Sequence, residues 1–175
     1  VIDTPRGRAR QMNAGARAAA VARTPQDVLL FLHADTTLPD GALDAVHAAL
    51  DAGAAWGRFD VRLDGRPWML RVVAALMNAR SRLTGIATGD QAMFMTRAAF
   101  DAAGGFPDQP LMEDIELSRR LKRAAGRPAC LRLTLRTSGR RWETRGVWRT
   151  IVLMWRLRLA YWLGASPEAL ARRYR

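Results

Sequence analysis

The sequence contains almost no cysteine and almost no lysine. Cys130 is the only cysteine in 175 residues, which excludes an intramolecular disulfide and any metal site built from several cysteines. A reducing compartment is therefore favoured, and we expect a cytoplasmic protein. Lys122 is the only lysine, so all the other basic residues except histidine are arginine, the side chain best suited to bidentate binding of phosphate or carboxylate.

The sequence shows no signal-peptide pattern and no uninterrupted apolar stretch long enough to span a membrane, so we expect neither a signal peptide nor a spanning helix. The longest apolar stretch, residues 147–163, contains Arg149, Arg156 and Arg158, which a spanning helix tolerates poorly. Its tryptophans and arginines are typical of a helix at a membrane surface. We therefore expect an α/β domain over residues 1–146, followed by an amphipathic helical segment over 147–175. The segment either packs on the core or binds the inner face of the cell membrane peripherally.

The composition is that of a globular protein with an anionic partner. Hydrophobic residues make up 49% of the chain and charged residues 25%, which excludes an intrinsically disordered protein. The formal net charge of +12 indicates binding to an anion. Composition leaves open whether the anion is a nucleic acid, a phospholipid surface or a nucleotide phosphate.

Apolar periodicity alternates between strand-like and helix-like segments, which predicts an α/β fold. The continuous apolar run at residues 28–32 is typical of a strand buried on both faces of a parallel sheet, so we predict a Rossmann-like, mostly parallel sheet flanked by helices. Further strands are predicted at residues 56–63, 92–95 and 131–135. Helices are predicted at residues 7–23, 39–51, 67–83, 97–103 and 112–126 and from residue 147 onward, with a break at 164–167.

Polar residues follow the first predicted strand at the place where open α/β sheets bind ligands. His33 and Asp35 lie just after its carboxyl end. A divalent cation held between phosphates needs only one or two protein carboxylates, so Asp35 is a candidate metal ligand. The alternative is that Asp35 caps the following turn. His33 is open to three roles: metal ligand, phosphate contact or buried neutral side chain.

Three other polar clusters are candidates. Glu113 and Asp114 begin a predicted helix, where carboxylates are also common because of the helix dipole. Gly89, Asp90 and Gln91 precede a strand, and they form either a contact with a sugar hydroxyl or a plain turn. The last cluster combines arginines with an aromatic ring and suits either a pyrophosphate and a stacked sugar or base, or a solvated charged surface. It comprises Arg140, Arg141, Trp142 and Arg145.

The order of these motifs along the chain resembles the family 2 glycosyltransferases of GT-A type, especially a small bacterial subgroup. The resemblance extends from Gly7 over almost the whole chain. It rests on the run from Gly7 to Gly15, on His33-Ala34-Asp35, Gly89-Asp90-Gln91, Gly104-Gly105-Phe106 and Glu113-Asp114, and on Arg141-Trp142.

The resemblance implies a role for each matching residue. In the family the aspartate motif at the strand end holds the Mn²⁺ or Mg²⁺ of a nucleotide-diphospho-sugar, which places the metal at Asp35, with His33 at the motif's first acidic position. The glutamate-aspartate pair implies Asp114 as catalytic base. Binding of donor or acceptor is implied for Gly89, Asp90, Gln91, Glu113, Arg141 and Trp142. The arginine-tryptophan pair resembles an element of processive members, but Ser138 replaces its usual glutamine, so processivity is not supported.

The family begins with a strand, a helix and a strand that bind the nucleotide base, and no such unit precedes Gly7 here. We therefore expect the N-terminal strands of the fold to be missing, an apolar sheet edge to be exposed, and this chain to have negligible activity alone. The implied reaction is inverting transfer of a sugar to an acceptor hydroxyl, on a lipid or a glycan. Hydrolysis is less favoured because it needs two cooperating carboxylates. A non-catalytic domain that binds nucleic acid or a membrane surface is the alternative, although no nucleic-acid motif is present and we expect no nucleic-acid partner.

Overall fold

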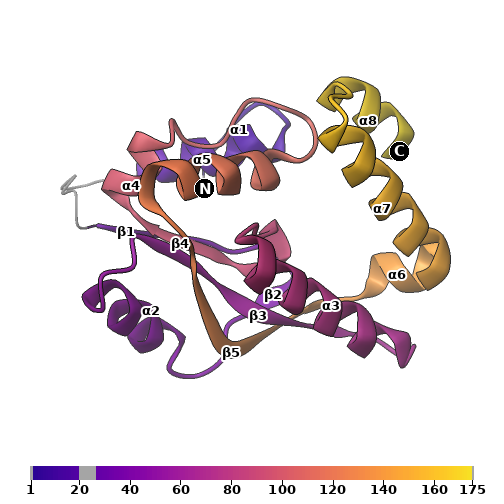
Figure 1. Cartoon of the computed structure of the whole chain (residues 1–175), viewed down its shortest axis with the longest axis horizontal. Helices are drawn as coiled ribbons and strands as arrows, with labels where there is room; N and C mark the ends of the chain where they lie inside the picture. Colours follow the sequence, from indigo (N-terminus) through magenta and orange to yellow (C-terminus); the bar gives the residue numbers. More distant parts are fainter. Residues whose placement is uncertain (1, 20–26, 175) are drawn as a thin grey trace.

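The computed structural model describes residues 2–19 and 27–174 and shows helices around one five-stranded sheet (Figure 1). The strands are β1 (Val28–Phe31), β2 (Thr36–Thr37), β3 (Trp56–Asp64), β4 (Met93–Thr96) and β5 (Ala129–Ser138). The helices are α1 (Arg8–Ala18), α2 (Ala42–Asp51), α3 (Met69–Thr84), α4 (Arg97–Ala102), α5 (Glu113–Ala125), α6 (Arg140–Arg145), α7 (Val147–Trp162) and α8 (Pro167–Tyr174). A short 3₁₀ helix, η1, spans Gly89–Gln91.

The sheet is mixed, so the prediction of a mostly parallel sheet is wrong, whereas the α/β class is confirmed. Its strand order is β1-β4-β3-β5-β2, and within the described residues only β3 and β5 pair in parallel. The segment between α3 and β4 explains the antiparallel pairing of β4. Gln91 bonds to Asn78, which bonds to Val61, and the chain then runs back so that Met95 pairs with Trp56. An apolar run predicts that a segment is a strand but not the direction in which the strand pairs, so the sequence pattern did not predict this change of chain direction.

Strand β1 lies at an edge of the sheet. In the part of the chain that the structure describes, β4 is the only strand that pairs with β1. Leu29 is buried, but its neighbours Val28 and Leu30 are only partly buried and Leu32, just after the strand, is exposed. The apolar run predicted to be buried on both faces therefore borders an open edge.

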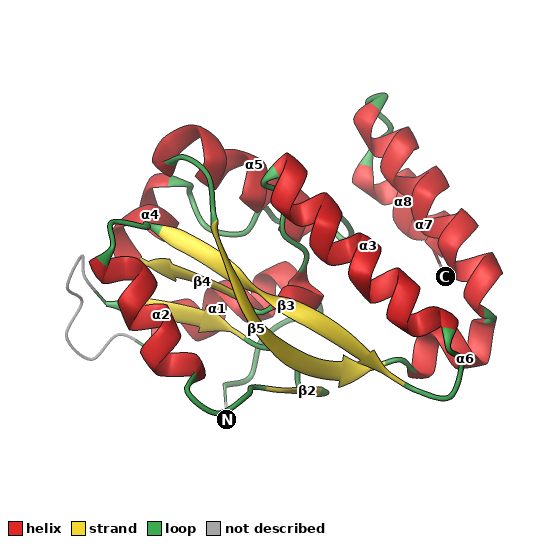
Figure 2. Cartoon of the chain, turned by 60° about the horizontal axis from the view of Figure 1, so that its bottom comes forward, coloured by secondary structure: helices red, strands yellow, loops and turns green. Residues whose placement is uncertain are grey.

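Two hydrophobic clusters fill the two sides of the sheet. Helices α1, α4 and α5 pack on one side, where Trp56, Leu117 and Leu121 are buried. Helices α2 and α3 pack on the other side, around Phe59 and Phe94 (Figure 2). Each of these helices buries apolar residues that lie three or four positions apart. This is the spacing from which the helices were predicted.

Most of the predicted elements are present, with three additions, one of which is the 3₁₀ helix η1. Strand β2 and helix α6 were not predicted, because β2 has only two residues and α6 is mostly charged and so lacks an apolar period. Strand β5 is longer than the predicted 131–135. The predicted end of the first helix at Thr24-Pro25 lies outside the described residues, as does Val1.

Helices α7 and α8 form a third cluster with the loop before α5. Leu157 and Leu170 are buried there against Leu111 and Met112. Gly164 lies between the two helices, at the predicted break. Across residues 2–19 and 27–174, no helix combines the length and the apolar character that crossing a membrane requires.

Candidate functional site

A cavity of about 1090 Å³ opens at the carboxyl end of β1. It is lined by residues from β1, from the turns that follow β1 and β5, from α1 and from α6. Large cavities with a few converging polar groups are the usual location of small-molecule sites. The polar residues that converge here are Arg8, His33, Asp35, Asp90, Arg140, Arg141 and Arg145.

The turn after β1 places Asp35 beside the end of β5. The Thr36 amide donates a 3.1 Å hydrogen bond to the carbonyl of His33, which closes the turn. Strand β2 then pairs with β5, and the Thr36 hydroxyl donates to that of Thr137 at 2.8 Å. As a result the exposed carboxylate of Asp35 lies on the cavity wall near the start of α6.

A chain of charged and polar groups connects four elements at the cavity. The Arg8 guanidinium lies 2.7 Å from Nε2 of His33, and His33 Nδ1 lies 3.4 Å from a carboxylate oxygen of Asp90. Arg8 Nε is also 3.5 Å from Glu113. Burial raises the pKa of Asp90, but the hydrogen bond and charge of His33, with Arg8 and Arg141, outweigh it and hold that pKa below its usual value. Asp90 therefore stays ionised.

Helix η1 presents its backbone to Asp114. The Gly89 amide donates a 2.8 Å hydrogen bond to Asp114 Oδ2, and the Ile115 amide donates to Oδ1 at 2.8 Å. A Cβ at position 89 would lie 2.7 Å from His33 Nε2, so any other residue there would displace the His33 ring. Sequence reasoning paired these motifs only through the family resemblance, and the structure brings them into direct contact.

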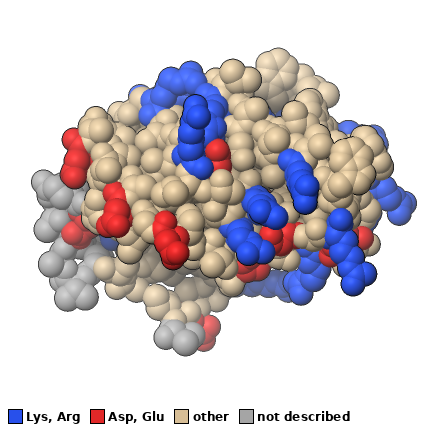
Figure 3. Space-filling view, turned by 90° about the horizontal axis from the view of Figure 1, so that it is seen from below, with Lys and Arg blue, Asp and Glu red and all other residues tan. Residues whose placement is uncertain are grey.

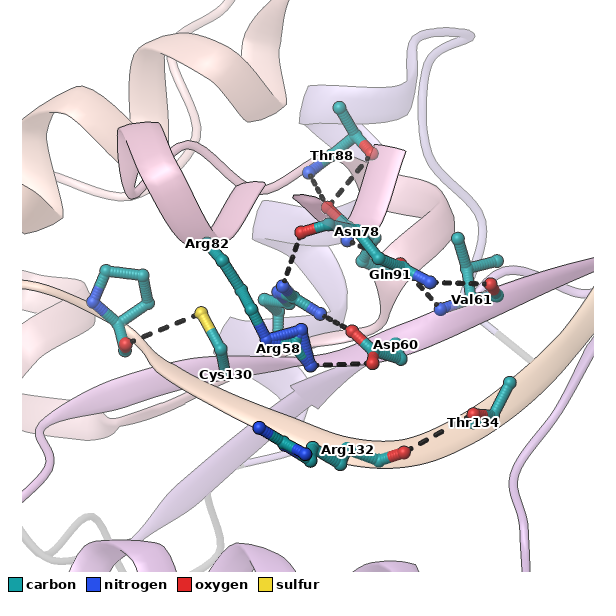
Figure 4. Close-up of polar contacts among 11 residues, drawn as sticks. Arg58, Asp60, Val61, Asn78, Arg82, Thr88, Gln91, Cys130, Arg132 and Thr134 are labelled. Carbon is teal, nitrogen blue, oxygen red and sulfur yellow. Dashed lines mark hydrogen bonds and ion pairs between the residues drawn. The ribbon is translucent and has the colours of Figure 1, made fainter. Parts of the chain in front are cut away.

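The side chain of Gln91 is fully buried and anchors η1 instead of facing the cavity. Its Oε1 accepts from the Thr88 amide at 3.2 Å, and its Nε2 donates to Asn78 at 3.3 Å (Figure 4). Asn78 in turn bonds both backbone groups of Val61 at 3.0 Å. Gln91 was predicted to contact the sugar donor or the acceptor. Because its side chain is buried, it would affect their binding only indirectly, by positioning Asp90.

The same network in Figure 4 contains a buried arginine. Arg58 is fully buried on β3, and it donates to Asp60 and, at 3.1 Å, to the Asn78 carbonyl. Arg82 donates to the second carboxylate oxygen of Asp60 at 2.6 Å. Because a buried charge is costly unless it is paired, this arrangement fixes α3 against β3 and so fixes the frame behind η1.

Glu113 and Asp114 occupy different environments at the start of α5. The side chain of Glu113 is only 2% exposed, and its Oε1 has an ion-pair contact with Arg8 but no hydrogen bond. Burial, together with the neighbouring charge of Asp114, raises the pKa of Glu113. Met112, just before them, adopts a left-handed backbone with φ of 65° while its side chain packs under α7 and α8. The C-terminal helices therefore help to position this pair, which contacts Gly89 and Arg8 but is not among the residues that line the cavity.

Three arginines near the predicted site residues were not predicted to act there: Arg8 and Arg80 were given no role, and Arg158 was considered only as part of the predicted membrane-surface segment. Arg8 lies in the run from Gly7 to Gly15. Its contacts with His33 and Glu113 could not be predicted, because these residues come together only in the folded chain. Arg80 on α3 and Arg158 on α7 both interact electrostatically with Asp114. Burial lowers the pKa of both, that of Arg80 to about 10, and Arg158 adds to the effect on Arg80. No sequence signal marks them, because they come from helices far apart in the chain.

Helix α6 supplies the basic wall of the cavity. Gly139 joins β5 to α6, and Arg141 and Arg145 of that helix lie over the Tyr174 ring at 5.1 and 5.8 Å. Burial lowers the pKa of Arg141, whereas Asp90 and Asp35 act to raise it. Trp142 is partly buried against the cluster that contains Leu70, with part of its side chain on the cavity wall.

The two predicted metal ligands, Asp35 and His33, have different surroundings. Within the described residues there is no group of three or more His, Cys, Asp or Glu side chains that could hold a metal ion. His33 has its two ring nitrogens turned to Arg8 and Asp90. The exposed carboxylate of Asp35 fits a cation that takes its remaining ligands from phosphate oxygens and water.

Comparison with known proteins found no similar protein: no family model, no curated protein and no solved structure matches the chain. The function is therefore inferred from the site's geometry and the sequence motifs.

Proposed function

We propose that this protein is an inverting glycosyltransferase that takes its sugar from a nucleotide-diphospho-sugar. The observation that carries the proposal is the cavity at the end of β1, which is lined by two carboxylates, Asp35 and Asp90, and by two arginines, Arg8 and Arg141. Cations suit the diphosphate of such a donor, and carboxylates suit its metal ion and its sugar hydroxyls. The single cysteine favours a cytoplasmic reaction.

The basic wall would bind the diphosphate of the donor. Arg8 of α1 and Arg141 of α6 both line the cavity, and Trp142 adds an apolar surface for a sugar or base. Asp35 would hold Mn²⁺ or Mg²⁺ together with the phosphate oxygens. When bound, the metal supplies positive charge that stabilises the leaving diphosphate.

Asp114 is the proposed base. It takes the proton of the acceptor hydroxyl, whose oxygen forms a bond to the anomeric carbon as the bond from that carbon to the diphosphate oxygen breaks. One displacement inverts the configuration. Each oxygen of Asp114 already accepts a backbone amide, which fixes its orientation and leaves a lone pair for the proton. Glu113 is buried and faces Arg8, so we assign it a positioning role.

Binding to the metal and to the diphosphate are coupled in this proposal, and calorimetry tests the coupling. We expect Mn²⁺ to bind only in the presence of uridine or guanosine diphosphate, and Asp35→Ala to remove the metal-dependent part of the heat. Asp40→Ala is the matched control, because Asp40 is also exposed but does not line the cavity. Identical heats for wild type and Asp35→Ala would refute the metal assignment.

A further inference from the structure

A second cavity, with a volume of about 650 Å³, lies along helix α7 and is bordered by Arg173 of α8. The two helices pack side by side through Leu157 and Leu170 (Figure 1). None of its lining residues lines the cavity at the end of β1, so the two cavities are separate. Its volume falls in the range of small-molecule sites, which is about 300–1,000 Å³. We call this cavity the α7–α8 groove.

Aliphatic and aromatic side chains of α7 form the apolar part of the groove. Leu157 is buried and lies deepest, whereas Val152 is 54% exposed and Trp148 is 68% exposed. These side chains follow the helical period, because residues three or four positions apart lie on the same side of a helix. Leu153 and Ala160 complete the apolar lining. A ligand of the groove therefore needs an aliphatic part.

Three arginines supply all the charge of the groove. Arg149 and Arg156 come from α7, two helical turns apart, and Arg173 comes from α8. All three are exposed, so they are open to a ligand. Within the described residues, none of them has a hydrogen bond or an ion pair with another side chain, and no acidic residue lines the groove. A ligand of the groove therefore also needs an anionic group.

The lining excludes ligands that are rich in neutral polar groups. Apart from the Trp148 indole, the side chains that line the groove are aliphatic or are arginines. Peptide amides and sugar hydroxyls would lose water there without gaining enough partners, which costs about 1–3 kcal/mol for each group left without a hydrogen bond. A second copy of the chain also fits poorly, because each copy carries a net charge of +12.

We propose that the α7–α8 groove binds one molecule of an anionic amphiphile, an aliphatic chain that ends in a phosphate or a carboxylate. The chain lies on Val152 and Leu157, and the anionic group binds to the arginines of the groove. A bilayer surface fits less well, because it would rest on exposed side chains such as Trp155 and Trp162, which do not line the groove. This site is additional to the donor cavity and does not depend on the proposed sugar transfer.

Calorimetry with single-chain probes tests the two parts of the ligand. Dodecyl phosphate and dodecanoate, kept below the concentrations at which they form micelles, should each bind with one molecule per chain. Dodecyl maltoside has the same chain without the anion, and inorganic phosphate has the anion without the chain, so each should bind at least tenfold more weakly. Equal binding of dodecyl maltoside, competition by inorganic phosphate at the same concentration, or no binding of either anionic probe would overturn the proposal.

Two pairs of variants test whether the groove is the site. Arg173→Gln should weaken dodecyl phosphate binding about tenfold. Arg172→Gln is its control, because Arg172 is exposed on the same helix but does not line the groove. Val152→Ser should weaken binding about fivefold, and its control is Val72→Ser, at an exposed position on α3. Circular dichroism checks that each variant is folded. Equal losses in a variant and its control would refute the groove as the binding site.

Two further measurements separate the groove from the other places where an anionic amphiphile could bind. Arg8→Gln, which changes the donor cavity, should leave dodecyl phosphate binding unchanged. A loss as large as that of Arg173→Gln would place the amphiphile in the donor cavity and refute the proposal. Flotation with phosphatidylglycerol vesicles tests the bilayer. Flotation of a chain that binds no monomeric dodecyl phosphate would assign α7 to the membrane surface instead.

Discussion

The two carboxylates at the start of α5 differ because one is buried against an arginine and the other is held by backbone amides. Asp114 accepts from Gly89 and Ile115, while Glu113 has no hydrogen bond to Oε1. Adjacent positions on a helix point in different directions, so one motif supplies two environments. In the proposed reaction, Asp114 is the group that exchanges a proton and Glu113 the one that positions its neighbours.

Asp114→Asn should separate binding from chemistry. Asparagine keeps the shape and the bond to the Gly89 amide but cannot accept the proton, so we expect sugar transfer to fall by about 10²–10⁴ with donor affinity retained. The measurement is transfer rate against donor binding, in a form of the protein that transfers sugar. Glu116→Gln, on the same helix, is the control. Normal turnover in Asp114→Asn would leave Asp114 as a helix-start residue only.

Glu113→Gln should stabilise the protein, and the gain should depend on pH. Burial raises the folded-state pKa of Glu113 above its ordinary value of 4.5, so the folded protein holds the proton more tightly than the unfolded chain. Stability is therefore lost as pH rises from the ordinary to the raised pKa. We expect the melting temperature of Glu113→Gln to exceed that of wild type at pH 8 by more than at pH 4, as measured by circular dichroism. A pH-independent difference would contradict this assignment.

At the scale of the elements, the sequence predicted most of the helices and strands. It did not predict how the strands pair. The run at residues 28–32 predicted β1, but its antiparallel pairing with β4 depends on the path around η1. Asp35 was predicted to be a site residue because it follows the carboxyl end of a predicted strand. The roles of Arg8, Arg80 and Arg158 were not predicted. Arg8 contacts His33 and Glu113, and Arg80 and Arg158 interact electrostatically with Asp114, and all of these interactions join elements that lie far apart in sequence.

Two glycines should respond oppositely to a methyl group. At Gly57 on β3 a Cβ would lie 2.5 Å from the Ala129 carbonyl and would also meet the Phe94 ring, so Gly57→Ala should cost about 1–3 kcal/mol through overpacking. A Cβ at Gly15 in α1 would meet no atom of the described residues within 4 Å apart from its chain neighbours and the helix's own backbone, so Gly15→Ala should add about 0.5–1 kcal/mol. Urea denaturation measures both. A tolerated Gly57→Ala would mean that β3 and β5 are farther apart than described here.

At the scale of the whole molecule, the charge is distributed unevenly. Figure 3 shows acidic groups toward α2 and basic groups toward α3 and α6 on the face seen from below. Arg62, Arg132 and Arg136 are exposed on the sheet, whereas Arg141 lines the cavity. Binding to a long polyanion and binding to a nucleoside diphosphate should therefore depend on different arginines.

Comparing the two ligands distinguishes a transferase from a nucleic-acid-binding domain. A duplex that spans many exposed arginines would release many counterions, so its affinity would fall steeply with salt and would drop similarly for Arg132→Ala and Arg141→Ala. A nucleoside diphosphate in the cavity meets few cations, so we expect a shallow salt dependence and a loss of about tenfold for Arg141→Ala alone. Titrations of both variants with both ligands, over a range of salt concentrations, give the two slopes. A diphosphate affinity that is unchanged in Arg141→Ala, with tight duplex binding at physiological salt, would favour the nucleic-acid-binding function, because the cavity would then contribute nothing that the surface does not.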